Sequence, residues 1–162
     1  MIRGRVVEVN GIGWNQWDAQ HRHPDDPGTR VGSERNLTWA AHLPKDNEVV
    51  FGEWWPTNEE RPLVSLEDEY ARELGLKLGD RLPFDIAGAR VDAAVASLRR
   101  LDWESLQPNF FLLFPPAVLQ GSAATYMTSF HLERDEKVFL NRLLSAYPTV
   151  TVIEVDAIIA QV

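Results

Sequence analysis

The chain has 162 residues, a formal net charge of −8 and no cysteine. This length suits one domain, or two small ones that share a core. The absence of cysteine excludes disulfides, cysteine nucleophiles and thiolate metal sites. The negative charge argues against nucleic acid as the main partner, because phosphate binding needs clustered Lys and Arg. No apolar run is long enough to span a bilayer.

The first portion of the chain, residues 3–116, is predicted to be rich in strands. Alternating apolar residues and turn residues indicate strands at 5–9, 36–39 and 48–51. Residues 12–34 show no period and are predicted to be irregular.

Residues 64–116 are predicted to form a short helix followed by a hairpin. Ser65 can cap the helix and Gly75 can end it in a left-handed conformation. The apolar stripe of this helix is Leu66, Tyr70 and Leu74. Residues 82–86 and 91–95 then alternate as the two strands of the hairpin. A further strand is expected from Arg99 through Trp103 to Phe114, where Pro115-Pro116 stops it.

The last portion, residues 124–162, has a different pattern. A strand at 126–132, a helix at 133–146 and a strand at 149–155 predict a small βαβ unit. The predicted fold class is therefore α+β, with a β-rich subdomain at 3–116 and an α/β subdomain at 124–162. A last helix from Asp156 stops after two turns, which is too short to be stable alone. We therefore expect residues 1–162 to be a fragment of a longer protein.

A metal site is one hypothesis for the irregular loop. His21, His23 and either Asp25 or Asp26 offer ligand types for zinc or manganese, which would make the protein a metal-assisted hydrolase. The alternative is a solvated loop rich in turn residues. The sequence contains neither a nucleophile elbow nor a phosphate-binding loop. We therefore predict no catalytic residue and no cofactor-binding residue.

The six Trp residues are the second group that deserves a functional hypothesis. They could line a ligand groove or anchor a partner, although packing is the commoner role of Trp. Trp54 and Trp55 precede Pro56, which indicates an exposed strand end. We predict that Trp54, Trp55 and Trp103 contact a partner or ligand. A stand-alone binding module, for a ligand such as a carbohydrate, therefore stays an alternative.

An ordered series of segments carries a resemblance to a known family. The series runs I-R-G-R-V-V-E-V-N-G, N-L-T-W, G-E-W-W, L-G-L-K-L-G-D and W-E-S-L-Q-P-N-F-F-L-L-F-P-P, and it continues to the end of the chain. It resembles the extracytoplasmic domain of the FtsX/MacB-type ABC transporter permeases, and within them the large YbbP-like permeases.

The resemblance implies a location, a role and partners. The chain would be a non-catalytic fragment of one MacB-like periplasmic domain, carried by a multi-pass protein of the bacterial inner membrane. ATP would act on a separate cytoplasmic ABC ATPase subunit, so this domain would need no cofactor. Motion driven by ATP would be transmitted to periplasmic handling or extrusion of a hydrophobic, lipid-like compound. A periplasmic esterase or lysophospholipase is the protein partner that the resemblance suggests.

Overall fold

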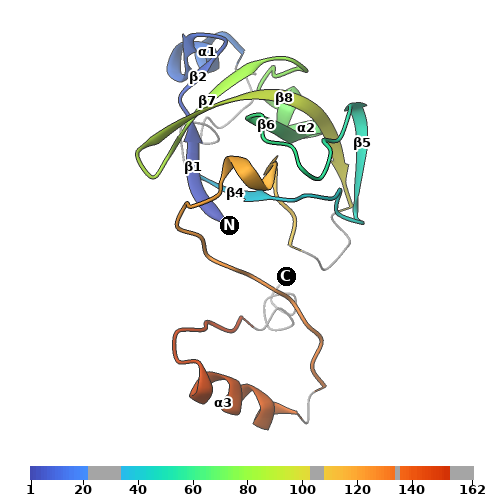
Figure 1. Ribbon diagram of the computed structural model, residues 1–162, viewed down its shortest axis with the longest axis vertical. Coiled ribbons are helices and arrows are strands. Elements are labelled where there is room, and N and C mark those ends of the chain that lie inside the picture. Colours follow the sequence, from blue (N-terminus) through green and yellow to red (C-terminus); the bar gives the residue numbers. More distant parts are fainter. Residues whose placement is uncertain (22–33, 103–107, 134–135, 154–162) are drawn as a thin grey trace. The chain divides into compact units, whose positions relative to one another are not determined.

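The computed structural model describes residues 1–21, 34–102, 108–133 and 136–153, and it folds into two compact units (Figure 1). We call the first, Met1–Ser129, the barrel unit, and the second, Phe130–Val162, the α3 unit. The predicted α+β class is confirmed, while the division at 3–116 and 124–162 stays a prediction. The elements are β1 (Ile2–Val6), β2 (Glu8–Val9), β3 (Ile12–Gly13), α1 (Trp14–His21), β4 (Arg35–Trp39), β5 (Asn47–Gly52), β6 (Leu63–Glu67), α2 (Asp68–Glu73), β7 (Arg81–Ile86), β8 (Ala89–Leu101), β9 (Leu112–Phe114), the 3₁₀ helix η1 (Pro116–Val118) and α3 (Lys137–Ala146).

Six strands of the barrel unit form a closed ring. Hydrogen-bonded neighbours follow the order β8-β6-β9-β4-β1-β7, and β7 pairs again with β8. The pairs β6–β8 and β4–β9 are parallel, and the other pairs of the ring are antiparallel. Because β8 is 13 residues long, its first half pairs with β7 and its last part pairs with β5. Each of these six strands therefore has two hydrogen-bonded neighbours within the ring.

The β7–β8 hairpin is confirmed as predicted. Ala87 and Gly88 join the strands, and both have positive φ angles, 52° and 84°. Two positive φ angles in a two-residue loop are typical of the turn whose twist suits a hairpin. Asp85 Oδ1 accepts a hydrogen bond from the Gly88 N–H at 3.0 Å, which holds the turn.

The helix predicted to start at Ser65 begins later. Ser65 lies in β6, fully buried between β8 and β9, and Glu67 is the N-cap of α2. The Glu67 carboxylate accepts the Tyr70 N–H at 2.6 Å. Hydrogen bonding to a strand on each side outweighs the local capping preference of Ser65. Gly75 does have the predicted left-handed conformation, with φ 66°.

The segment predicted to be irregular contains a helix. α1 follows the small β2–β3 hairpin and buries Trp14 and Trp17, which lie three residues apart and so share one face. The Trp17 indole Nε1–H donates to the Leu74 carbonyl at 2.9 Å, which fixes α1 against the end of α2. Burial of two large indoles stabilises a helix whose polar residues give little amphipathic pattern.

The barrel unit has an apolar core. Its fully buried side chains include Leu37, Leu66, Leu82, Phe84, Leu112 and Phe114. The rings of Phe84 and Phe114 meet edge to face, with centroids 5.1 Å apart. These residues come from four strands, β4, β6, β7 and β9, so the core depends on the pairing of strands that are distant in sequence.

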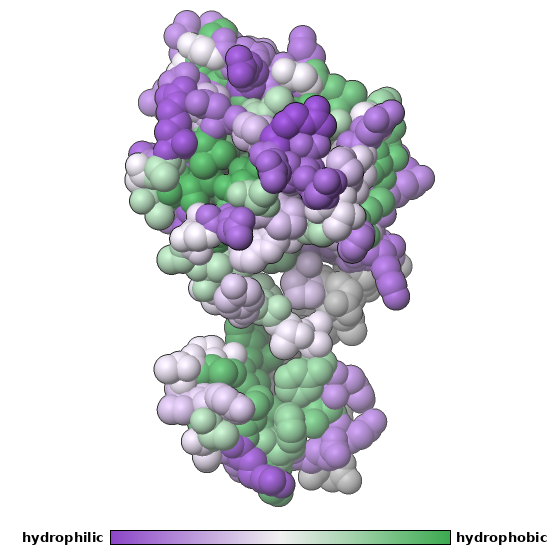
Figure 2. All heavy atoms as spheres, viewed as in Figure 1, coloured by the Kyte–Doolittle hydropathy of each residue, from purple (hydrophilic) through white to green (hydrophobic). Residues whose placement is uncertain are grey.

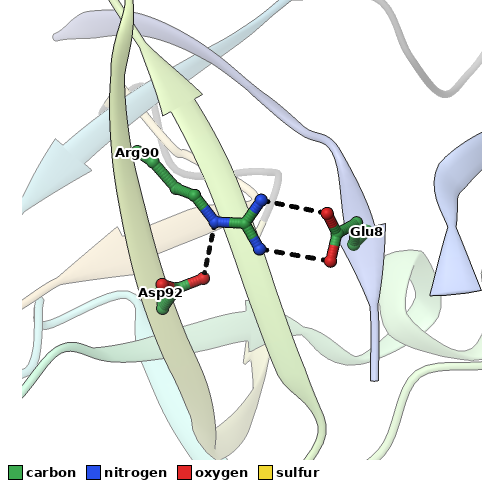
Figure 3. A network of polar contacts seen from close by, with 3 residues as sticks. All are labelled: Glu8, Arg90 and Asp92. Atoms are coloured by element: carbon green, nitrogen blue, oxygen red, sulfur yellow. Dashed lines mark hydrogen bonds and ion pairs between the residues drawn. The ribbon is translucent and has the colours of Figure 1, made fainter. Parts of the chain in front are cut away.

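One surface network fastens the β2–β3 hairpin to the β7–β8 hairpin (Figure 3). The Arg90 guanidinium donates two parallel hydrogen bonds to the Glu8 carboxylate, at 2.9 and 3.1 Å, and its Nε donates to Asp92 at 3.2 Å. The hydrogen bond from Arg90 lowers the pKa of Glu8 below its usual value. The geometry is bidentate, but all three groups border solvent, so salt will weaken the network.

The last portion of the chain, residues 124–162, differs from the predicted βαβ unit. Residues 126–132 form no strand, and neither do residues 149–153; residues 154–162, with the predicted helix at Asp156, lie outside the described part. α3 itself is confirmed, although it begins at Lys137 and not at 133. A strand needs a hydrogen-bonded neighbour, and the described residues of this portion offer none.

The α3 unit exposes much apolar surface. Its exposed large apolar side chains are Phe130, Val138, Phe139, Leu144, Tyr147, Val150 and Ile153. Figure 2 shows apolar spheres at the surface over α3. Within the described segments, no helix combines the length and the apolar character that crossing a bilayer requires.

Candidate functional site

The predicted metal loop is described only at its first residue. His21 ends α1, and its ring stacks on Trp17 with centroids 3.9 Å apart. Its Nδ1 lies 3.0 Å from the Trp17 carbonyl oxygen one turn earlier. His23, Asp25 and Asp26 lie outside the described residues. The described part of the chain contains no group of three His, Asp or Glu residues that could hold a metal ion, and the site at His21 stays a prediction.

Trp54 and Trp55 follow β5 and pack against the segment that follows β4. Their rings stack with centroids 4.0 Å apart, and their indole N–H groups donate to the carbonyls of Ala41 at 3.2 Å and Ala40 at 2.9 Å. Trp55 is buried, with 4% of its surface exposed, and Trp54 is half-buried. The pair therefore holds the segment directly after Trp39. Trp103 lies outside the described residues, and the contact role of the three Trp residues stays a prediction.

A groove of about 500 Å³ opens beside that segment. We call it the Trp39–Tyr126 groove, after its two aromatic residues. Its other lining residues are Thr57, Asn58, Glu59, Glu60, Pro116, Ala117, Leu119, Gln120, Gly121 and Ser122. The two aromatic rings stand almost perpendicular, at 87°, with centroids 6.3 Å apart. Apolar faces with a few convergent polar groups are typical of small-ligand sites.

Distant parts of the chain bring the two aromatic residues together. Trp39 is the last residue of β4 and pairs with Phe114 of β9. The Ala40 N–H donates to the Phe114 carbonyl at 3.1 Å, which extends that pairing by one residue. Tyr126 follows Thr125, whose N–H donates to the Met1 carbonyl at 2.9 Å and whose carbonyl accepts from the Met1 ammonium. The ring of strands thus positions Trp39, and a contact with the start of β1 positions Tyr126.

Glu59 has the most perturbed carboxylate of the groove. Its side chain is only 6% exposed and accepts three hydrogen bonds from Arg61: from the backbone N–H at 2.9 Å, from Nε at 2.8 Å and from Nη2 at 2.6 Å. Hydrogen bonding to the Arg61 side chain is the main cause that lowers the pKa of Glu59 to about 2. Its charge is therefore balanced in place, and Glu59 shapes the loop instead of acting as an acid or base near neutral pH.

A second polar cluster lies inside the barrel unit around Arg99 of β8, which has no exposed surface. Its Nε donates to Ser65 Oγ at 2.9 Å, and its Nη1 donates to Asn47 Oδ1. Its Nη2 donates to the carbonyls of Phe110 at 3.1 Å and Phe111 at 3.3 Å. Burial lowers the pKa of Arg99 to about 10, so the guanidinium remains protonated at neutral pH. The cluster joins β5, β6, β8 and the segment before β9, which is a structural role.

The sequence suggests a ligand-groove role for one of the two aromatic residues of this groove. Trp39 belongs to the Trp set that the sequence suggests for a ligand groove, whereas the alternation of residues 126–132 predicts a strand at Tyr126. Nothing in the local pattern indicates that Tyr126 meets a residue 87 positions earlier, because the meeting depends on how β1, β4 and β9 pair. The described residues of the groove offer neither a nucleophile–base pair nor a metal-ligand cluster.

Comparison with known proteins places the whole chain beside part of one larger protein. All 162 residues align at 39% identity with an uncharacterized ABC transporter permease, YbbP, of Escherichia coli K12. The chain spans 18% of the length of that permease. No protein-family model matches the chain, and no solved structure matches it.

Proposed function

We propose that this chain is a non-catalytic periplasmic domain of an ABC transporter permease. The premise is that the chain is related over its whole length to the YbbP-type permeases. The observation that carries the proposal is the 39% identity over all 162 residues to part of a permease. A domain of a transport protein needs a stable scaffold more than a reactive site. The closed ring of strands in the barrel unit provides such a scaffold.

The proposed mechanism is mechanical coupling. A cytoplasmic ABC ATPase subunit would bind the membrane part of the parent permease, and its ATP hydrolysis would move the periplasmic domain. This domain would itself bind no nucleotide and no cofactor. The compound handled would be hydrophobic or lipid-like, and a periplasmic esterase or lysophospholipase would be a protein partner. The exposed apolar side chains of the α3 unit support a hydrophobic cargo, since soluble proteins seldom expose contiguous apolar surface without a use for it.

A reporter insertion tests the periplasmic location. The exposed Ala87-Gly88 turn joins β7 to β8 and tolerates an insertion better than a strand would. Alkaline phosphatase inserted there in the full-length permease should be active, because the enzyme requires an extracytoplasmic environment to form its disulfides. An inactive phosphatase together with a fluorescent cytoplasmic reporter at the same turn would refute the location.

The coupling is tested in the reconstituted permease with its ATPase. Phe139 of α3 is 48% exposed, and Phe139→Glu places a charge on the apolar face of the helix. We expect this variant to lose stimulation of ATP hydrolysis by a lysophospholipid and to keep the basal rate. Ser145→Glu, which adds the same charge to the same helix away from that face, is the matched control. Equal stimulation in both variants would contradict a role of the α3 unit in handling the compound.

A further inference from the structure

We propose that the Trp39–Tyr126 groove binds an organic ammonium group, such as that of choline or ethanolamine. The inference rests on the groove alone and does not require the transport function proposed above. It assigns a ligand class to a surface of the barrel unit.

The arrangement of the two rings supplies the first argument. Two aromatic planes at 87° form a corner, in which a cation can approach the face of each ring. The negative face of an aromatic ring attracts such a cation, and proteins that recognise quaternary ammonium groups use several ring faces together. Tyr126 is 82% exposed, so its ring is free to contact a ligand, whereas Trp39 is half-buried and fixed at the end of β4.

The charges of the groove supply the second argument. Among the residues that the structure describes, its lining contains two carboxylates, Glu59 and Glu60, and no Lys, Arg or His. Arg61 neutralises Glu59, as its hydrogen bonds show. Glu60 is exposed, and no contact of its carboxylate is seen in the described part of the chain, so its negative charge remains available to a ligand. An anionic ligand would be repelled here, and a cationic one would be attracted.

The size and the polar lining narrow the ligand class. A groove of about 500 Å³ lies within the range of small-molecule sites. Asn58, Gln120 and Ser122 provide amide and hydroxyl groups that can hydrogen-bond a hydroxyl or ester oxygen of the ligand. A hydroxyalkyl ammonium group satisfies both features, because its cation fits the aromatic corner and its oxygen fits the polar side. The same chemistry is present in free choline and in a phosphocholine lipid headgroup.

The decisive comparison uses a charged ligand and its neutral analogue of the same shape. Choline and 3,3-dimethylbutan-1-ol are titrated separately into the ¹⁵N-labelled 162-residue chain, and NMR follows the indole N–H signals. We expect choline to cause a saturable shift of the Trp39 signal, while the signals of Trp14 and Trp17 stay in place. The neutral alcohol should cause little shift. An equal response to both compounds would overturn the proposal, and so would no response to choline at millimolar concentration.

Two exposed positions allow variants that should fold. Tyr126→Ala removes one ring face and should weaken choline binding by about 3- to 30-fold. Glu60→Gln removes the available charge and should weaken it by about 2- to 5-fold. The matched controls Tyr147→Ala and Glu53→Gln change exposed residues outside the groove and should leave the affinity unchanged. Unchanged affinity in Tyr126→Ala would refute the site.

A parallel titration with a short-chain phosphocholine lipid below its micelle concentration identifies the source of the ammonium group. Tighter binding of the lipid than of choline, abolished in the same variants, would assign the groove to a headgroup. Tighter binding of choline would assign it to a free metabolite. Binding of either compound that survives Tyr126→Ala would contradict the proposal.

Discussion

Replacement of the buried Arg99 should destabilise the barrel unit more than any exposed substitution on the same strand. Arg99→Met keeps the side-chain length but removes the donors that reach Ser65, Asn47 and the carbonyl of Phe110. The Phe111 carbonyl keeps a second donor, the Glu67 N–H at 2.9 Å. Ser65 Oγ likewise keeps a hydrogen bond from Ser97 Oγ at 2.7 Å. The main loss therefore comes from Asn47 Oδ1 and the Phe110 carbonyl, which belong to a buried and a half-buried residue and lose their Arg99 donors.

The expected magnitude follows from those orphaned groups. Each buried acceptor left without a donor costs about 1–3 kcal/mol, and removal of one member of a buried charged network typically costs about 3–5 kcal/mol. Domains of this kind have about 5–15 kcal/mol of stability in total. Arg99→Met should therefore remove about 3–5 kcal/mol from the free energy of unfolding. Arg99→Lys keeps the charge but reaches fewer acceptors, so its loss should be smaller.

Urea unfolding followed by Trp fluorescence measures the change. The control is Arg100→Met at the next position of β8, where the side chain is exposed and lies 3.8 Å from Glu48. This control should change the free energy of unfolding by no more than about 0.5 kcal/mol. A loss below about 1 kcal/mol in Arg99→Met would refute the reasoning, since the network would then contribute no more than a typical single hydrogen bond.

Three further substitutions test other parts of the structure. Gly52 has φ 78°, and Gly52→Ala would place a Cβ 2.2 Å from the Ala96 carbonyl oxygen, so we expect the free energy of unfolding in urea to fall by more than about 2 kcal/mol. The control Gly79→Ala, with φ 82° and no atom within 4 Å of the new Cβ, should lose only about 1 kcal/mol. Equal losses would show that backbone strain, and not the steric clash, sets the cost. The pKa of Glu59 is lowered from 4.5 to about 2, so the stabilisation from its carboxylate is present above pH 4.5 and is lost as pH falls toward 2. Glu59→Gln should therefore reduce the dependence of the urea midpoint on pH over that range. A variant with the same pH dependence as the original chain would contradict the Arg61 contact. Trp55→Ala removes a buried indole and should cost about 3–5 kcal/mol by the same assay, and a loss below about 1 kcal/mol would mean that Trp55 does not pack as described.

The sequence predicted best the elements that depend only on residues close together in the chain. The β7–β8 hairpin depends on alternation over a few residues and on one turn at Ala87-Gly88, and both are visible in the sequence. The helix α1 was missed, although Trp14 and Trp17 three residues apart and His21 four further on lie on one helical face. That spacing is the signal which would have found it.

The features that the sequence did not predict depend on pairing between distant strands. Ser65 has a residue type that caps helices, but ladders to β8 and β9 place it in a strand. Residues 126–132 have the alternation of a strand, yet no neighbour is present among the described residues to accept their hydrogen bonds. The burial of Arg99 and the meeting of Trp39 with Tyr126 follow from the order of strands in the ring, which no short segment encodes.

The position of β1 in the ring has a consequence for assembly between copies of the chain. β1 is the strand that closes the ring, because it pairs with β4 on one side and with β7 on the other. Release of these first residues would expose two unpaired strand edges at once. The β1 of a second molecule has the same sequence and fits the same gap, so partial unfolding that releases β1 would allow strand exchange between copies.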